Sequence, residues 1–159
     1  MINNAMCRMF GTDIPVFGFS HCRNVVSEIT RAGGLGCLGT AYYSPGQLET
    51  ELRWIDDQVG GKPYGVNLLL PQRYETVGEA LDPAKLPEGH VKWQARLLDD
   101  AGIPPLPAQE RDRLLAEELE QMHMTPEFAS EILEVVLRHP NVKLVVSALG
   151  SPPKEILDR

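Results

Sequence analysis

Short apolar runs and helix-spaced apolar residues alternate along the first 70 residues of the chain. Residues 14–19, 35–38 and 64–70 are nearly continuous apolar runs, and each predicts a buried core strand. Ser20 follows the first run and is the predicted cap of a helix. The inward-facing residues expected on that helix are Val25, Val26 and Ile29. The order of strand, helix and strand predicts parallel βαβ units.

The segment between the second and third runs carries the clearest helix signals. Ser44 is placed as the N-cap, Pro45 as the first helical residue and Gln47 as the partner in a capping box. Apolar residues then recur at helical spacing, at Leu48, Leu52, Ile55 and Val59. The pair Gly60-Gly61 can take the left-handed conformation that ends a helix. A helix is therefore predicted from Pro45 to near Gln58.

The third and fourth predicted strands are separated by a segment far longer than the usual βα loop of about 2 to 6 residues. We predict that this segment is a helical excursion over about 72–141. The periodicity predicts helices over 91–101 and 110–122 in this segment, and a third helix that begins at Thr125-Pro126. A strand over 142–150 and a helix from Lys154 to the last residue are predicted after it. The chain is thus predicted to be an α/β protein with four βα units.

Composition and charge narrow the classes of partner and location. With 159 residues and 43% hydrophobic content, the chain can build one core, so a single domain over 1–159 is expected. A formal net charge of −7 argues against nucleic acid or an anionic membrane as the main partner. The absence of a long apolar stretch and of signal-peptide features in residues 1–10 predicts a cytoplasmic protein. The three cysteines fit neither a disulfide framework nor a metal clip, and they are expected to be reduced and buried.

The glycines at 34, 36 and 39 match the dinucleotide-binding pattern G-x-G-x-x-G. The context argues against that function, because a helix is predicted before these glycines and a strand coincides with them. The binding motif needs a strand first and a helix opening directly from the glycines. We therefore favour tight turns and close packing for Gly33 and Gly34.

Several segments together resemble the nitronate monooxygenases, formerly called 2-nitropropane dioxygenases, which are FMN-dependent barrels. The resemblance is carried by the segments 14–18, 32–39, Ser44-Pro45 with its helix, 63–68 and 145–152. It implies an incomplete TIM-type (β/α)8 barrel, built from the first four βα units as one partial domain. Flavin-dependent enoyl reductases share the same signature, so a flavin-dependent NAD(P)H or enoyl reductase is a second possibility.

The resemblance also implies a set of flavin contacts. Phe17 and Gly18 would lie under the flavin ring, and Asn67 would offer its amide to the polar edge of the isoalloxazine. Ser147 and Gly150 would leave room for the ring or the substrate. The position of Asn67 also favours a ligand contact independently of the resemblance, because ligands of parallel βα barrels bind at the carboxyl ends of the strands. The alternatives are backbone capping for Asn67 and tight barrel packing for Ser147 and Gly150.

The sequence departs from the family pattern in two places. Most relatives have Gln-Gly-Pro-Met where this chain has residues 17–20, which His21 follows. The family's catalytic histidine and phosphate-binding loops belong to the second half of the barrel, which this sequence does not contain. We therefore assign no catalytic residue and no metal ligand, and do not expect His21 to be the base.

The remaining alternative is a non-catalytic half-barrel that self-associates through open edges. The expected ligands are FMN, an alkyl nitronate and O2.

Overall fold

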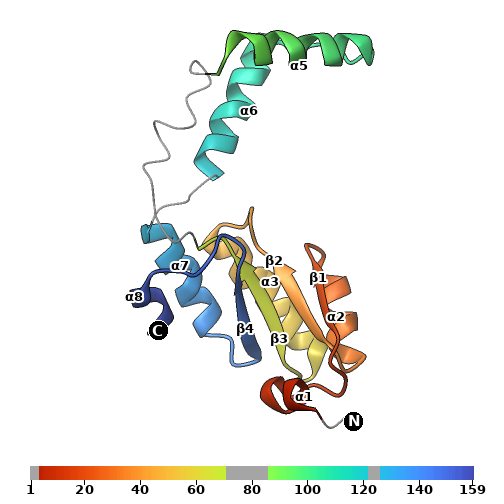
Figure 1. Cartoon of the computed structure of the whole chain (residues 1–159), viewed down its shortest axis with the longest axis vertical. Coiled ribbons are helices and arrows are strands. Elements are labelled where there is room, and N and C mark those ends of the chain that lie inside the picture. Colours follow the sequence, from red (N-terminus) through yellow and green to blue (C-terminus); the bar gives the residue numbers. More distant parts are fainter. Residues whose placement is uncertain (1–3, 71–85, 122–125) are drawn as a thin grey trace. The chain divides into compact units, whose positions relative to one another are not determined.

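The computed structural model describes residues 4–70, 86–121 and 126–159, and within them four parallel strands form one sheet (Figure 1). The strands lie side by side in chain order. They are β1 (Phe17–Ser20), β2 (Leu35–Gly39), β3 (Tyr64–Leu68) and β4 (Val142–Ser147). Every neighbouring pair is parallel, which confirms the predicted α/β class.

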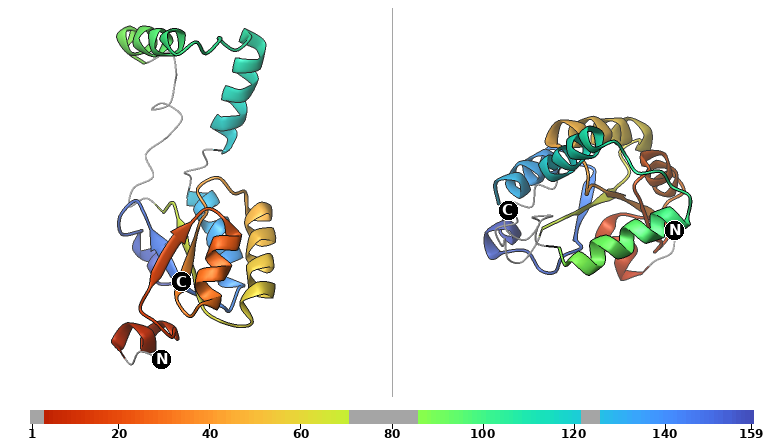
Figure 2. Two further views of the ribbon diagram at one scale, coloured as in Figure 1. Left: turned by 90° about the vertical axis from the view of Figure 1, so that its right-hand side faces the viewer. Right: turned by 90° about the horizontal axis from the view of Figure 1, so that it is seen from above.

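The helices that follow the strands pack against one face of this sheet. The helices of this part of the chain are α1 (Ala5–Phe10), α2 (Arg23–Arg31), α3 (Pro45–Val59), α7 (Pro126–Leu137) and α8 (Lys154–Leu157). Helix α2 contacts β1 and β2, and α3 lies between α2 and α7 (Figure 2). Arg23 joins two of these helices, because its guanidinium pairs with Glu51 at 3.0 Å and lies over the ring of Trp54. Sequential strand order with the helices on one face is the arrangement of successive units in a βα barrel.

Helix α3 forms as its local signals predict. The Ser44 side chain accepts a hydrogen bond from the Gln47 backbone, and the Gln47 side chain accepts one from the Ser44 backbone. Gly60 ends the helix in the left-handed conformation, with φ of 58°. The four predicted apolar positions, Leu48, Leu52, Ile55 and Val59, are all buried. Strand β2 is likewise buried at every residue, as the apolar run predicts.

Strand β1 is not the buried core strand that its apolar run predicts. Phe17 is 41% exposed and Phe19 is 56% exposed, because β1 lies at the edge of the sheet and these side chains alternate with positions facing α2. Val25 on α2 is also exposed, whereas Val26, one position further on, is fully buried. The spacing therefore predicts the inward-facing side of α2 correctly at Val26 and wrongly at Val25.

One irregularity interrupts the pairing of β3 with β4. Tyr64 pairs with Val142 but Gly65 pairs with Leu144, so Lys143 is an extra residue in β4. The side chain of Tyr64 is fully buried, and its hydroxyl lies 3.5 Å from the Leu52 carbonyl of α3. Since side chains alternate along a strand, Gly65 and Asn67 belong to the opposite face. We call it the helix-free face because α2, α3 and α7 lie on the other one; α1 contacts its amino-terminal edge at Phe17.

The chain divides into two compact units, residues 1–73 with 124–159, and residues 74–123. The second unit contains α5 (Glu88–Asp100) and α6 (Ala108–Gln121), which agree with helices predicted in the excursion. Part of the predicted excursion, 72–85 and 122–125, lies outside the described residues. No helix in the described residues is both long enough and apolar enough to cross a membrane.

Candidate functional site

The carboxyl ends of the strands bring residues from β2, β3 and β4 into one row. Gly39 pairs with Asn67, and Asn67 pairs with Val146. Asn67 is half-buried and lies on the helix-free face, and its backbone carbonyl accepts hydrogen bonds from Thr40 Oγ1 at 2.8 Å and Thr40 N at 3.2 Å. These bonds occupy the backbone of Asn67 and not its amide side chain, which is the group that the sequence predicts to bind a ligand.

His21 extends the row to the first strand. It directly follows β1, in which Ser20 pairs with Leu38, so His21 is level with Gly39. Its Nδ1 lies 3.2 Å from the Gly39 carbonyl oxygen, and its ring packs edge-on against Phe19 with centroids 5.1 Å apart. The carboxyl end of the sheet therefore carries an imidazole and an aromatic ring at β1 and an amide on β3, with Gly39 of β2 between them.

Ser147 and Gly150 lie at the same end of the sheet but differ in their surroundings. Ser147 pairs with Leu68, and its hydroxyl donates to the Leu70 carbonyl at 2.9 Å. The hydroxyl is thus already engaged in joining β4 to the segment after β3. Gly150 has φ of 99°, a conformation that favours glycine, and a Cβ there would meet no atom within 4 Å.

Phe17 and Gly18 lie at the opposite end of β1 from this row. Phe17 pairs with Leu35, the first residue of β2, and its ring contacts Phe10 of α1 edge-on at 5.4 Å. A Cβ on Gly18 would lie 2.4 Å from Ile29 Cδ1, so this glycine allows α2 to approach the sheet. The structure therefore places Asn67 and Ser147 at the same end of the sheet but on opposite faces, and it does not place Phe17 or Gly18 beside either of them.

The glycines of the G-x-G-x-x-G pattern serve packing. A Cβ on Gly36 would lie 2.2 Å from the Val26 carbonyl oxygen, and a Cβ on Gly34 would lie 2.8 Å from the Val16 carbonyl oxygen. The Gly36 backbone N–H donates to Thr30 Oγ1 at 3.2 Å within the protein. The expectation of packing at Gly34 is supported, and these contacts leave no room for a pyrophosphate against Gly36.

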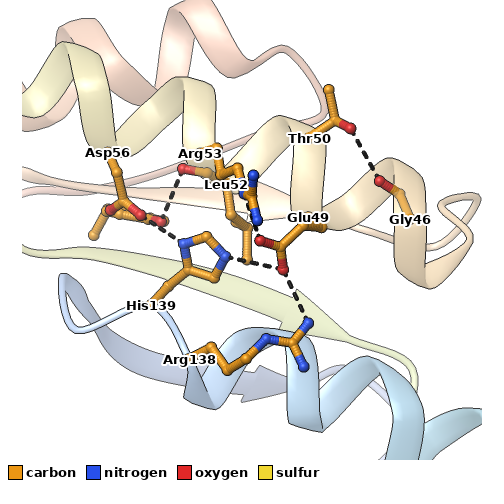
Figure 3. A network of polar contacts seen from close by, with 9 residues as sticks. Gly46, Glu49, Thr50, Leu52, Arg53, Asp56, Arg138 and His139 are labelled. Atoms are coloured by element: carbon orange, nitrogen blue, oxygen red, sulfur yellow. Dashed lines mark hydrogen bonds and ion pairs between the residues drawn. The ribbon is translucent and has the colours of Figure 1, made fainter.

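A polar network at the other end of the sheet joins α3 to the turn between α7 and β4 (Figure 3). His139 is only 6% exposed, and its Nδ1 lies 2.5 Å from Asp56 Oδ2. Its Nε2 lies 3.6 Å from Glu49 Oε2, which also accepts from Arg138 at 2.9 Å. Asn141 donates to the second oxygen of Asp56 at 3.0 Å. These hydrogen bonds and ion pairs hold the turn before β4 against α3.

Charge and burial shift two pKa values in this network. Hydrogen bonds from Arg138 and Arg53 lower the pKa of Glu49 from 4.5 to about 2, so the carboxyl is ionised at neutral pH. Burial raises the pKa of Tyr64, and the Asp56 carboxylate raises it further, so the phenol stays neutral. No local sequence pattern predicts this network, because Asp56 and His139 are 83 positions apart.

The structure agrees only in part with the prediction that the three cysteines are reduced and buried. All three are free thiols, but Cys22 is exposed at the start of α2 while Cys7 and Cys37 are buried. Cys22 is the N-cap residue of α2, two residues after the end of the edge strand β1. Within the described ranges, no group of three His, Cys, Asp or Glu residues is placed to hold a metal ion.

Comparison with known proteins places this site in context. The sequence model of the family described as nitronate monooxygenase matches residues 13–159. A Mycobacterium tuberculosis protein named as a monooxygenase is 38% identical over 97% of this chain and 41% of its own length. A Staphylococcus haemolyticus protein named as a nitronate monooxygenase is 26% identical over 50% of this chain and 23% of its own length. The chain spans less than half the length of these relatives.

Proposed function

Since the chain belongs to the nitronate monooxygenase family, we propose that it supplies part of the flavin cradle of an FMN-dependent nitronate monooxygenase. The observation that carries the proposal is the position of Asn67. Its amide lies at the carboxyl end of a central strand, on the face opposite α2, α3 and α7. Ligands of parallel βα barrels bind at this end of the strands.

The residues around Asn67 fit the ring of a flavin. The row neighbour Gly39 has no side chain, while Phe19 and Tyr42 are exposed aromatic residues close to His21. Flat aromatic surface with a few polar groups suits a heteroaromatic ligand. In this arrangement Asn67 would hydrogen-bond the polar edge of the ring and Phe19 would pack beside it.

The chain's own part in the reaction is to bind and orient. Bound FMN supplies the redox chemistry by which an alkyl nitronate is oxidised with O2 to a carbonyl compound and nitrite. Gly150, three residues after the end of β4, leaves open space that substrate or ring could occupy. Phe17 and Gly18 are proposed to contact the flavin from the other end of β1, where Phe17 pairs with Leu35 and Gly18 with Gly36.

We test the cradle with the visible absorption spectrum of the purified chain after incubation with FMN and removal of unbound ligand. Retained flavin, lost in Asn67→Ala and kept in the control Gln58→Ala on the exposed end of α3, supports the proposal. Folded protein that retains no flavin contradicts it. A flavin-loaded protein is then assayed for nitrite release from an alkyl nitronate and for NAD(P)H oxidation, which separates the monooxygenase from a reductase.

A second candidate function is self-association through the sheet edges. In the described residues β1 and β4 each pair on one side only, and the exposed Phe17 and Phe19 lie on the first of these edges. Unpaired edges favour strand addition. Sedimentation velocity on the flavin-free chain tests this: a stable dimer, weakened by Phe19→Lys but not by the control Tyr42→Lys, supports it, and a monomer contradicts it.

A further inference from the structure

The hydrogen bond of His21 determines which of its ring nitrogens can accept. Nδ1 lies 3.2 Å from the Gly39 carbonyl oxygen, and a carbonyl oxygen can only accept. Nδ1 therefore carries the hydrogen, and in the neutral ring Nε2 is the accepting nitrogen. The protein thus fixes a histidine tautomer at the carboxyl end of β1.

Gly39 allows the His21 ring to lie over the neighbouring strand. A Cβ on Gly39 would lie 2.6 Å from both Nδ1 and Cε1 of His21, and 2.7 Å from Phe19 Cζ. The imidazole therefore occupies the space above Gly39 that a side chain would take. Because Gly39 pairs with Asn67, the ring is about one strand spacing, roughly 5 Å, from the strand that carries Asn67.

Aromatic residues and a backbone contact hold the imidazole in this position. Phe19 lies edge-on to it at 5.1 Å, and the Tyr42 ring lies 6.5 Å away at a tilt of 44°. The Tyr43 hydroxyl donates to the His21 carbonyl at 3.3 Å. The acceptor is therefore presented from a supported ring at the edge of the helix-free face, and not from a free surface side chain.

We propose that His21 is a ligand-positioning residue whose Nε2 accepts a hydrogen bond from the imide N–H of the flavin ring. Asn67, beside it in the row, donates to the adjacent ring carbonyl. This inference rests on the proposed flavin cradle. An amide donor beside an imidazole acceptor matches the alternating carbonyl and N–H groups of an imide edge. His21 thereby selects ligands that carry a donor between two carbonyls.

The test compares FMN with N3-methyl-FMN, which lacks this donor, by flavin fluorescence titration of the whole chain. The unmodified chain is expected to bind FMN about 10-fold more tightly than the methylated analogue, because the analogue leaves the acceptor unpaired. His21→Phe keeps a ring without an acceptor, so the preference is expected to fall to about 1-fold. His21→Gln, which retains an acceptor oxygen, is expected to recover part of the preference. His90→Phe on α5 is the control and should preserve it.

A second measurement does not depend on ligand. The long-range proton–nitrogen NMR spectrum of the flavin-free chain should show His21 protonated at Nδ1 and bare at Nε2. A hydrogen on Nε2 in the neutral ring overturns the inference. If the unmodified chain and the His21→Phe variant show the same preference for FMN over N3-methyl-FMN, the inference is overturned and the proposed function remains intact. Absence of flavin binding in the unmodified chain overturns both.

Discussion

His139 Nδ1 and Asp56 Oδ2 lie 2.5 Å apart, and they join the turn after α7 to the middle of α3. Both ring nitrogens of this buried histidine face carboxylates, Asp56 on one side and Glu49 on the other. The residues that meet here are on opposite sides of the long excursion in the sequence. The contact therefore helps to hold β4 in the sheet, independently of the row at the carboxyl ends of the strands.

Replacing His139 with alanine is expected to destabilise the fold by about 2–4 kcal/mol, because the half-buried Asp56 loses one of its partners and a cavity forms where the buried imidazole was. Urea unfolding followed by circular dichroism measures the change. Arg53→Ala is the matched control in the same network. Its exposed side chain makes an i,i+4 pair with Glu49, so a loss of about 0.5 kcal/mol or less is expected. Equal losses in the two variants would contradict a structural role for His139.

The Glu49 carboxyl makes stability depend on pH in the acid range. Its pKa is about 2 in the folded protein against 4.5 in its ordinary state, so the folded state stabilises the ionised form. This contribution is complete above about pH 4.5 and is lost as the pH falls towards about 2. Glu49→Gln is expected to flatten this part of the profile. Urea midpoints measured across the interval check it, and an unchanged slope in the variant would be the contrary result.

Gly36→Ala is expected to destabilise the protein by about 2 kcal/mol or more, because the new Cβ would lie 2.2 Å from the Val26 carbonyl oxygen. The backbone of α2 would have to move away from β2. Gly46→Ala in the first turn of α3 is the control, since a Cβ there meets no atom within 4 Å, and alanine should be neutral or stabilising by up to about 1 kcal/mol. Thermal melting of both variants distinguishes them, and a tolerated Gly36→Ala would contradict the close packing.

Cysteine labelling under native conditions should modify one thiol. Cys22 is exposed, whereas Cys7 is buried and burial raises the pKa of Cys37 from 9.0 to about 11. Mass spectrometry after brief treatment with iodoacetamide is expected to locate a single adduct on Cys22, absent in Cys22→Ser. Unfolding in urea should expose all three thiols. Fast native labelling of Cys37 would show that β2 is more accessible than its contacts indicate.

Elements with local signals were predictable from the sequence, and α3 is the clearest case. Its cap, its apolar spacing and its terminal glycine act within one segment, so no distant contact is needed to define it. The short helix α1 carries similar signals, with Asn4 accepting from the Cys7 backbone and Gly11 in the left-handed conformation. Apolar spacing predicts no helix over these six residues, although the cap and the terminal glycine are present.

The errors arise where the environment of a residue depends on distant segments. The apolar run of β1 resembles a core strand, but its edge position leaves Phe17 and Phe19 exposed. The burial of His139 depends on α3, and the position of His21 depends on Gly39 lacking a side chain. Asn67 could be placed in advance because strand direction alone fixes the end at which it lies. Its role as a ligand contact remains a prediction.

The extra residue in β4 has a consequence for how this strand tolerates changes in length. Between Val142 and Leu144 the chain advances two residues while its partner advances one, so Leu144 takes the side of the sheet that Lys143 would otherwise take. Deleting Lys143 would therefore restore regular pairing and leave every later residue of the strand on its present side, whereas an insertion after Leu144 would exchange the sides of the residues that follow it. The strand can therefore lose one residue at this position without any change in which of its side chains face the helices.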